Sequence, residues 1–212
     1  MPSEVTNPEE NGMSLETVVD RYARDLVERA RPIGAADRIL DLGCGTGIVA
    51  RILRERLGGA ANIVGVDASP SMIEEARSIE PELDWRVGNA MALPFVDGSF
   101  DLVLCQEMLQ FVPDRLAALR EVQRVLSPGG RLLVSTWRPR SEQLFDGAAL
   151  GQALTEAGFT DVRVATVSLT EFADGLGAPS AADVAAGSAP RMGQHDAVRI
   201  QTNGGNHDVR DR

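Results

Sequence analysis

Ile39-Leu40-Asp41-Leu42-Gly43-Cys44-Gly45-Thr46-Gly47 is the stretch of sequence that decides the fold. Its first four residues predict a short buried strand, and three glycines at alternate positions follow. Glycines at this spacing let the backbone turn tightly and let a ligand approach the main chain. A helical pattern begins at the last glycine. The stretch therefore predicts a strand, a glycine-rich turn and a helix, although a tight turn without a ligand stays open for this segment alone.

Further along the chain, short apolar runs alternate with helical patterns, which is typical of βαβ units and a parallel sheet. The runs expected to form strands are 38–42, 62–66, 84–88, 100–105, 131–137 and 161–167. The patterns expected to form helices are 14–30, 47–57, 70–78, 114–126 and 147–157. Ser69 is expected to cap one of these helices, because a proline at the first helical position follows it.

The length of 212 residues, of which 43% are apolar, favours a single domain with one sizeable core. We expect an N-terminal cap segment and helix over residues 1–32, a ligand-binding core over 33–167 and an irregular tail over 168–212. The tail either is disordered or contains a last strand at 197–201. Polar residues at Arg199 and Gln201 suit a half-exposed edge strand better than one covered on both faces.

The charge and the cysteine content exclude several classes of protein. Acidic residues outnumber basic ones, 31 to 21, which disfavours a nucleic-acid partner because such a partner requires a cationic surface. Neither a bilayer-spanning apolar run nor a signal peptide is evident, so we expect no membrane association and a cytoplasmic location. Cys44 and Cys105 are expected to be free thiols, and no residue spacing suggests a metal site.

Asp67 is the next acidic residue at the end of a predicted strand, twenty residues beyond Gly47. In Rossmann-type folds a carboxylate at the tip of the second strand accepts hydrogen bonds from ribose hydroxyls. The competing interpretation is a negative charge at the start of the next helix. The ribose role is the interpretation that we prefer.

The motif at 41–47 resembles motif I of class I S-adenosylmethionine-dependent methyltransferases. The resemblance is closest to the small-molecule branch of ubiquinone, menaquinone and natural-product methyltransferases. Residues 88–95 resemble the adenine-binding loop of that family, 100–106 its fourth strand and 126–131 the turn before its fifth strand. The resemblance implies an α/β fold, a Rossmann-like three-layer sandwich. Its mostly parallel seven-stranded sheet would have the order 3-2-1-4-5-7-6, with strand 7 antiparallel and helices on both faces.

The resemblance also implies S-adenosyl-L-methionine as the cofactor and a set of residues that bind it. Asp41 would help to hold the amino group, Asp67 the ribose, and Asn89 the adenine amine, at a position where the family more often has aspartate. An asparagine side-chain oxygen still accepts a hydrogen bond from that amine. The full expected set is Asp41, Gly43, Cys44, Gly45, Gly47, Asp67, Ala68, Met72, Asn89, Ala90, Cys105 and Gln106.

The implied reaction is the in-line transfer of a methyl group to an oxygen, nitrogen or carbon atom of a small-molecule acceptor. Such a displacement requires alignment and exclusion of water more than a dedicated catalytic residue, so no catalytic residue is assigned. Residues 105–111 would border cofactor and acceptor, with Gln106 orienting a polar group. Ordinary packing is an equal alternative for Met108, Leu109 and Phe111. His195 and His207 lie in the tail, and a homodimer stays open.

Two other functions stay open. A non-catalytic protein that binds S-adenosylmethionine or S-adenosylhomocysteine would fit the short connection between residues 138 and 146, where relatives commonly insert a lid. An NAD(P)-dependent oxidoreductase would share the alternating strands and Asp67. Its fingerprint spaces the second and third glycines by two residues, and Tyr22 is the only tyrosine, so no Tyr-x-x-x-Lys pair exists.

Overall fold

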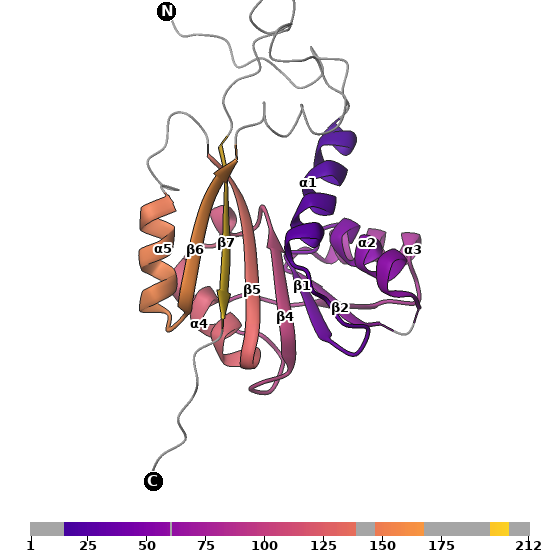
Figure 1. The fold of residues 1–212 in the computed structure, drawn as a ribbon. Coiled ribbons are helices and arrows are strands. Elements are labelled where there is room, and N and C mark those ends of the chain that lie inside the picture. The colour runs from indigo at the N-terminus through magenta and orange to yellow at the C-terminus, as the bar shows by residue number, and fades with distance from the viewer. Residues whose placement is uncertain (1–14, 60, 139–146, 168–195, 204–212) are drawn as a thin grey trace, which may run out of the picture.

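The computed structural model describes residues 15–59, 61–138, 147–167 and 196–203 (Figure 1). Most elements begin and end within two residues of the positions expected from the sequence; the strand expected at 131–137 instead begins at residue 126. In chain order, the helices and strands are α1 (Leu15–Arg29), β1 (Arg38–Leu42), α2 (Ile48–Leu57), β2 (Asn62–Asp67), α3 (Pro70–Ile79), β3 (Asp84–Val87), β4 (Phe100–Gln106), η2 (Leu109–Phe111), α4 (Arg115–Val125), β5 (Leu126–Arg138), α5 (Gly147–Glu156), β6 (Thr160–Val167) and β7 (Asp196–Asn203).

One sheet holds these strands in the order β3-β2-β1-β4-β5-β7-β6. Strands β1 to β5 pair in parallel, and β7 runs antiparallel to both β5 and β6. The predicted mostly parallel sheet is confirmed. The strand order reverses between β1 and β4, and ligands of open α/β sheets bind outside the carboxyl ends of the strands at such a point. Residues 1–14, 168–195 and 204–212 lie outside the described residues, His195 and His207 among them.

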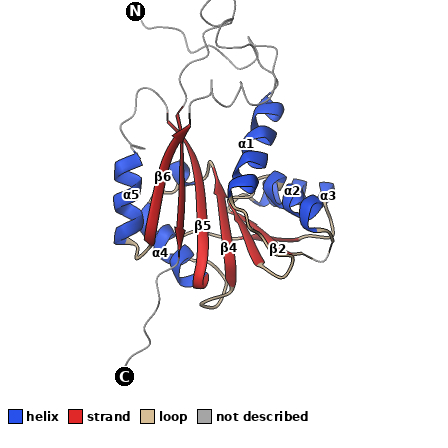
Figure 2. Cartoon of the chain, viewed as in Figure 1, coloured by secondary structure: helices blue, strands red, loops and turns tan. Residues whose placement is uncertain are grey.

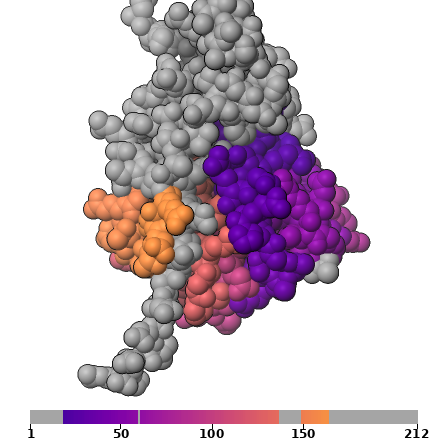
Figure 3. All heavy atoms as spheres, in the orientation of Figure 1, coloured from indigo at the N-terminus to yellow at the C-terminus, as the bar shows by residue number. Residues whose placement is uncertain are grey.

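Helices cover both faces of the sheet (Figure 2). Alternate residues of a strand point to opposite faces, and in β1 Ile39 packs with α1, α2 and α3 whereas Leu40 packs with α4 and α5. Strands buried on both faces read as continuous apolar runs, which is why the apolar runs in the sequence located them. Helices α2 and α3 lie at one end of the sheet and α5 lies at the other (Figures 1 and 3). No helix within the described ranges is both long and apolar enough to cross a membrane.

The amino end of the sheet is tied by an ion pair between β1 and β4. Arg38 donates from Nε to Asp101 Oδ2 at 3.0 Å and from Nη2 to Asp101 Oδ1 at 2.8 Å. Ser127 Oγ also donates to Asp101 Oδ1 at 2.8 Å. The hydrogen bonds from Arg38 hold the pKa of Asp101 well below its usual range. This pair lies at the amino-terminal ends of β1 and β4, and the glycine-rich turn lies at the opposite, carboxyl end of β1.

The indole of Trp85 fixes the glycine-rich turn against the sheet. Trp85 is buried, and its Nε1 donates to Glu80 O at 2.7 Å. A Cβ built on Gly47 would lie 2.2 Å from the ring, and one built on Gly65 would lie 2.3 Å from it. Two glycines from different segments therefore make room for one aromatic side chain.

Gly65→Ala should destabilise the fold by about 1–3 kcal/mol, because the added methyl group overlaps the Trp85 ring. Combined with Trp85→Phe, whose ring is smaller, the cost should be less than the sum of the two single changes. Urea-induced unfolding measures these differences in the free energy of unfolding. Gly59→Ala is the control, because no described atom lies within 4 Å of its added Cβ. Additive effects of the two changes would contradict the overlap.

Candidate functional site

A cleft of about 400 Å³ opens at the carboxyl ends of β1 to β4, beside the point where the strand order reverses. Its volume lies in the range of about 300–1,000 Å³ that is usual for small-molecule sites. The cleft is lined by Leu42, Gly43, Gly45, Val66, Asp67, Ala68, Ser69, Met72, Gly88, Asn89, Ala90, Glu107, Met108, Phe111, Val112 and Pro113. Seven of the twelve residues expected to bind a cofactor are among them: Gly43, Gly45, Asp67, Ala68, Met72, Asn89 and Ala90.

The glycine-rich turn presents bare backbone to this cleft. Gly43 N and Cys44 N both donate to Val66 O, at 2.7 and 3.1 Å, which holds the turn on β2. Gly45 has a φ of +53°, and no described atom lies within 4 Å of the place where its Cβ would stand. Gly43 is different, since its Cβ would lie 2.3 Å from Met108 Cγ. Open space for a ligand therefore lies at Gly45, whereas Gly43 accommodates a neighbouring side chain.

The Asp67 carboxylate is bonded to two segments of main chain. Its Oδ2 accepts a hydrogen bond from Gly45 N at 2.9 Å, and its Oδ1 accepts one from Ser69 N at 2.8 Å. Ser69 in turn caps α3, with Oγ accepting from Met72 N at 3.4 Å, as the sequence predicted. Each carboxylate oxygen has about two lone-pair sites, so each keeps capacity for a ligand. Asp67 thus both shapes the cleft and remains able to bind within it.

A tight turn at residues 89–92 forms another wall of the cleft. Ala92 N donates to Asn89 O, and Met91 N donates to Asn89 Oδ1, both at 2.9 Å. The turn follows Gly88, whose N donates to Asp67 O at 2.9 Å. The side-chain oxygen of Asn89 therefore holds its own turn while the residue lines the cleft.

Five of the expected residues lie outside the cleft lining: Asp41, Cys44, Gly47, Cys105 and Gln106. Asp41 is only 1% exposed, and its Oδ2 accepts from Ala50 N at 3.0 Å, at the start of α2. Gly47 packs on Trp85. Asp41, Cys105 and Gln106 lie near the ends of strands as expected, but the sequence does not say which side of the strand each side chain occupies.

The two cysteines are buried in the hydrophobic core. Burial raises the pKa of the Cys105 thiol to about 12, with a further contribution from the charge of Glu107. Burial also raises the pKa of Cys44 strongly. Both side chains are therefore neutral thiols near pH 7 that fill space behind the turn and β4.

Gln106 faces α1 and not the cleft. Its Nε2 donates to Val19 O at 3.3 Å, and its buried Oε1 has no hydrogen-bond partner in the described part of the chain. The expected role of Gln106 in orienting a ligand is therefore not supported by its position. The next residue, Glu107, lines the cleft instead, with a φ of +53°. The sequence placed Glu107 in the segment that borders the cleft but gave it no individual role, because no local pattern predicts a left-handed conformation for glutamate.

Apolar side chains form the mouth of the cleft. Met72 is 44% exposed and Phe111 is 79% exposed, and both line the cleft with Met108. Leu109, which was expected at the same place, is buried in the core. Leu109 and Phe111 both lie in the 3-10 turn η2, where successive side chains point in different directions. Leu109 therefore points into the core while Phe111 points to the mouth of the cleft.

Asp41→Asn should make the chain more stable at neutral pH. Burial, assisted by the charge of Asp67, raises the pKa of Asp41 from 3.8 to about 7 in the folded chain, against the smaller opposing effect of the Ala50 hydrogen bond. The folded chain then holds this proton more tightly than the unfolded chain, so the stability linked to it is complete below about pH 4 and is lost as the pH rises through about 7. The asparagine oxygen still accepts from Ala50 N.

The gain in the free energy of unfolding of Asp41→Asn over the wild type should therefore increase between about pH 4 and 7, by on the order of a few kcal/mol, and level off above. Urea-induced unfolding at a series of pH values measures it. A difference that stays constant from pH 4 to 8 would show that Asp41 does not titrate in this range.

Within the described residues, no group of three His, Cys, Asp or Glu side chains lies close enough together to hold a metal ion.

Comparison with known proteins shows a matching domain and a shared fold. Residues 40–134 match a family model described as "Methyltransferase domain". Demethylmenaquinone methyltransferase from Lactococcus lactis subsp. lactis (strain IL1403) is 43% identical over 100 residues, which are 45% of this chain and 40% of that protein. The chain spans less than half the length of the first curated relatives that it matches.

Two solved structures share the fold. Phosphoethanolamine N-methyltransferase 2 from Haemonchus contortus, in complex with phosphomonomethylethanolamine and S-adenosylhomocysteine, has a TM-score of 0.69 at 18% identity, covering 87% of this chain and 52% of that chain. The cyclase SpnF has a TM-score of 0.68 at 24% identity, covering 91% of this chain and 84% of that chain. At such identities the likeness shows the fold alone. Residues 40–134 therefore match a methyltransferase domain, and the described chain has the Rossmann-like fold of these two solved structures.

Proposed function

We propose that the cleft binds S-adenosylmethionine and that the protein transfers its methyl group to a small-molecule acceptor. The observation that carries this proposal is the pairing of bare backbone at Gly45 with the Asp67 carboxylate, within one cleft at the switch point of the sheet. A nucleoside with a charged tail requires such a pair, since its ribose needs an acceptor and its tail needs close access to the main chain. The matching methyltransferase domain supports the same conclusion.

In this proposal, each residue that lines the cleft contacts a particular part of the cofactor. Asp67 accepts from the ribose hydroxyls, Asn89 accepts from the adenine amine and Ala90 offers its N–H to the ring. Ala68 and Met72 flank the adenine, and Gly43 and Gly45 admit the methionine part. The other expected residues act from behind the cleft. Asp41 supports the turn beside the amino group through its bond to Ala50 N, and Cys44, Gly47, Cys105 and Gln106 shape the surrounding strands.

The exposed apolar mouth favours an acceptor with an apolar body. Phe111 and Met72 present apolar surface at the opening, where an acceptor would meet the cofactor. The similarity to a demethylmenaquinone methyltransferase supports a quinone-like ring as the first acceptor to test. Methyl transfer there would depend on alignment and on exclusion of water. A homodimer, a cytoplasmic location and the exclusion of nucleic acid stay predictions from the sequence.

Binding of S-adenosylhomocysteine tests the proposal directly. At 100 times its dissociation constant, the product should add about 2.7 kcal/mol to the free energy of unfolding and raise the melting temperature. Calorimetric titration and thermal unfolding measure both quantities, with NAD as the comparison ligand. A rise with NAD and none with S-adenosylhomocysteine would contradict the proposed cofactor. Incubation with methyl-labelled cofactor and a panel of phenols, quinols and amines then separates an enzyme from a non-catalytic binder.

Asp67→Ala should weaken S-adenosylhomocysteine binding by more than tenfold, because each hydrogen bond to a charged group contributes about 1.5–3 kcal/mol. It should also lower the melting temperature, because Gly45 N and Ser69 N lose their acceptor. Asp101→Ala is the matched control, since that carboxylate also bonds main chain and a side chain but stands at the opposite edge of the sheet. The control should lose stability and keep its affinity; equal losses of affinity in both variants would place the ligand elsewhere.

A further inference from the structure

We propose that Glu121 and Arg124, on the side of α4 that faces the loop after residue 92, are positioning residues that set the adenine selectivity of the site. They would do so by clamping the turn at residues 89–92 from behind. The inference rests on the proposed function, because it takes Asn89 as the group that recognises the adenine amine. Neither residue lines the cleft.

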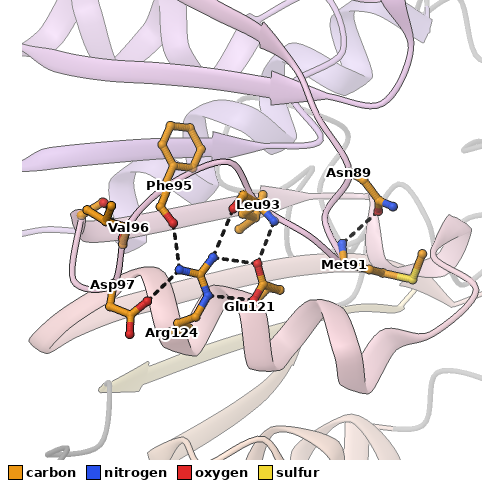
Figure 4. A network of polar contacts seen from close by, with 9 residues as sticks. Asn89, Met91, Leu93, Phe95, Val96, Asp97, Glu121 and Arg124 are labelled. Atoms are coloured by element: carbon orange, nitrogen blue, oxygen red, sulfur yellow. Dashed lines mark hydrogen bonds and ion pairs between the residues drawn. The ribbon is translucent and has the colours of Figure 1, made fainter.

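Leu93 is the point at which α4 holds the turn (Figure 4). Leu93 N donates to Glu121 Oε2 at 2.7 Å, and Leu93 O accepts from Arg124 Nη2 at 3.1 Å. The Leu93 side chain is buried in the core beneath α4. Both polar groups of its main chain are thus bonded to side chains of α4.

Arg124 uses every N–H of its guanidinium in this clamp. Nε and Nη2 donate to the two oxygens of Glu121 at 2.8 and 2.7 Å, Nη2 also donates to Leu93 O, and Nη1 donates to Phe95 O and to Asp97 Oδ1, both at 2.8 Å (Figure 4). A guanidinium has five N–H groups, so none is left for another partner. The arrangement requires the planar fork of arginine, because a lysine ammonium is a single point with three donors.

The other end of the turn is fixed at the cleft. Gly88 N donates to Asp67 O, and the turn closes through Ala92 N and Asn89 O. Residues 89–92 are therefore held at one end by the Asp67 main chain and at the other end by Glu121 and Arg124 of α4. Asn89 Oδ1 accepts from Met91 N within the turn, so the direction of the Asn89 side chain depends on the backbone of the turn that Leu93 anchors. Displacements of about 1 Å in a positioning element are enough to change recognition strongly.

The opposite charges of Glu121 and Arg124 keep the pair formed at neutral pH. The hydrogen bond from Arg124 lowers the pKa of Glu121, and Glu121 and Asp97 raise the pKa of Arg124. The pair is half-buried, with Glu121 22% and Arg124 31% exposed in their side chains, so solvent screens it less than a pair on the open surface. Backbone bonds add to it, since Gly98 N donates to Arg124 O at 3.0 Å.

Arg124→Lys tests the clamp with little change in charge. Calorimetric titration of the full chain gives the dissociation constants of S-adenosylhomocysteine and of S-inosylhomocysteine, in which a carbonyl replaces the exocyclic amine. The wild type should prefer the adenine compound. Arg124→Lys should raise the dissociation constant of S-adenosylhomocysteine about tenfold. The ratio of the two dissociation constants should then approach one. Glu121→Gln keeps an acceptor for Leu93 N, so its preference for the adenine compound should lie between that of the wild type and that of Arg124→Lys.

Arg38→Lys is the matched control, because it weakens an arginine–carboxylate pair at the amino-terminal ends of the strands, away from the cleft. It should lower the melting temperature and leave the preference between the two ligands unchanged. An unchanged preference in Arg124→Lys, an equal loss of preference in Arg38→Lys, or a wild type that binds both ligands equally would each overturn the positioning role. A wild type that does not bind S-adenosylhomocysteine would overturn the proposed function and this inference with it.

Discussion

The architecture of the cleft depends on one carboxylate. Asp67 accepts hydrogen bonds from Gly45 N and Ser69 N, and so connects the turn after β1 with the start of α3. Its own main-chain oxygen accepts from Gly88 N, at the end of β3. Three strand ends are therefore held in register by a single residue. A group with this many structural partners is a stable reference point for a ligand, because its side chain cannot rotate without breaking the surrounding turns.

Much of this arrangement is local, and local patterns predict it well. The alternating glycines indicated a turn between β1 and α2, and the serine and proline at 69 and 70 indicated the start of α3; both are confirmed. The parallel sheet followed from apolar runs separated by helical patterns. These features depend on backbone conformation and on the period of the apolar residues, which a sequence displays directly.

The orientation of individual side chains was harder to predict. Asp41 and Cys105 stand at the ends of strands that lead to the cleft, yet both are buried behind it. A change of one residue along a strand reverses the face, so a correct strand with an uncertain register leaves the lining undecided. The clamp of Arg124 on Leu93 joins residues thirty-one positions apart, and no local pattern indicates it. Contacts of that kind follow from how α4 lies against the loop.

The packing of Trp85 against Gly47 and Gly65 has a consequence for how this sequence can change over evolutionary time. While the indole is present, neither glycine can gain a side chain without a clash. Replacement of Trp85 by a smaller residue frees position 65 first, because Gly47 also needs its φ of +83°. Positions 65 and 85 should therefore vary together among homologues, with alanine or serine at 65 accompanied by a smaller residue at 85, while position 47 stays glycine in either background.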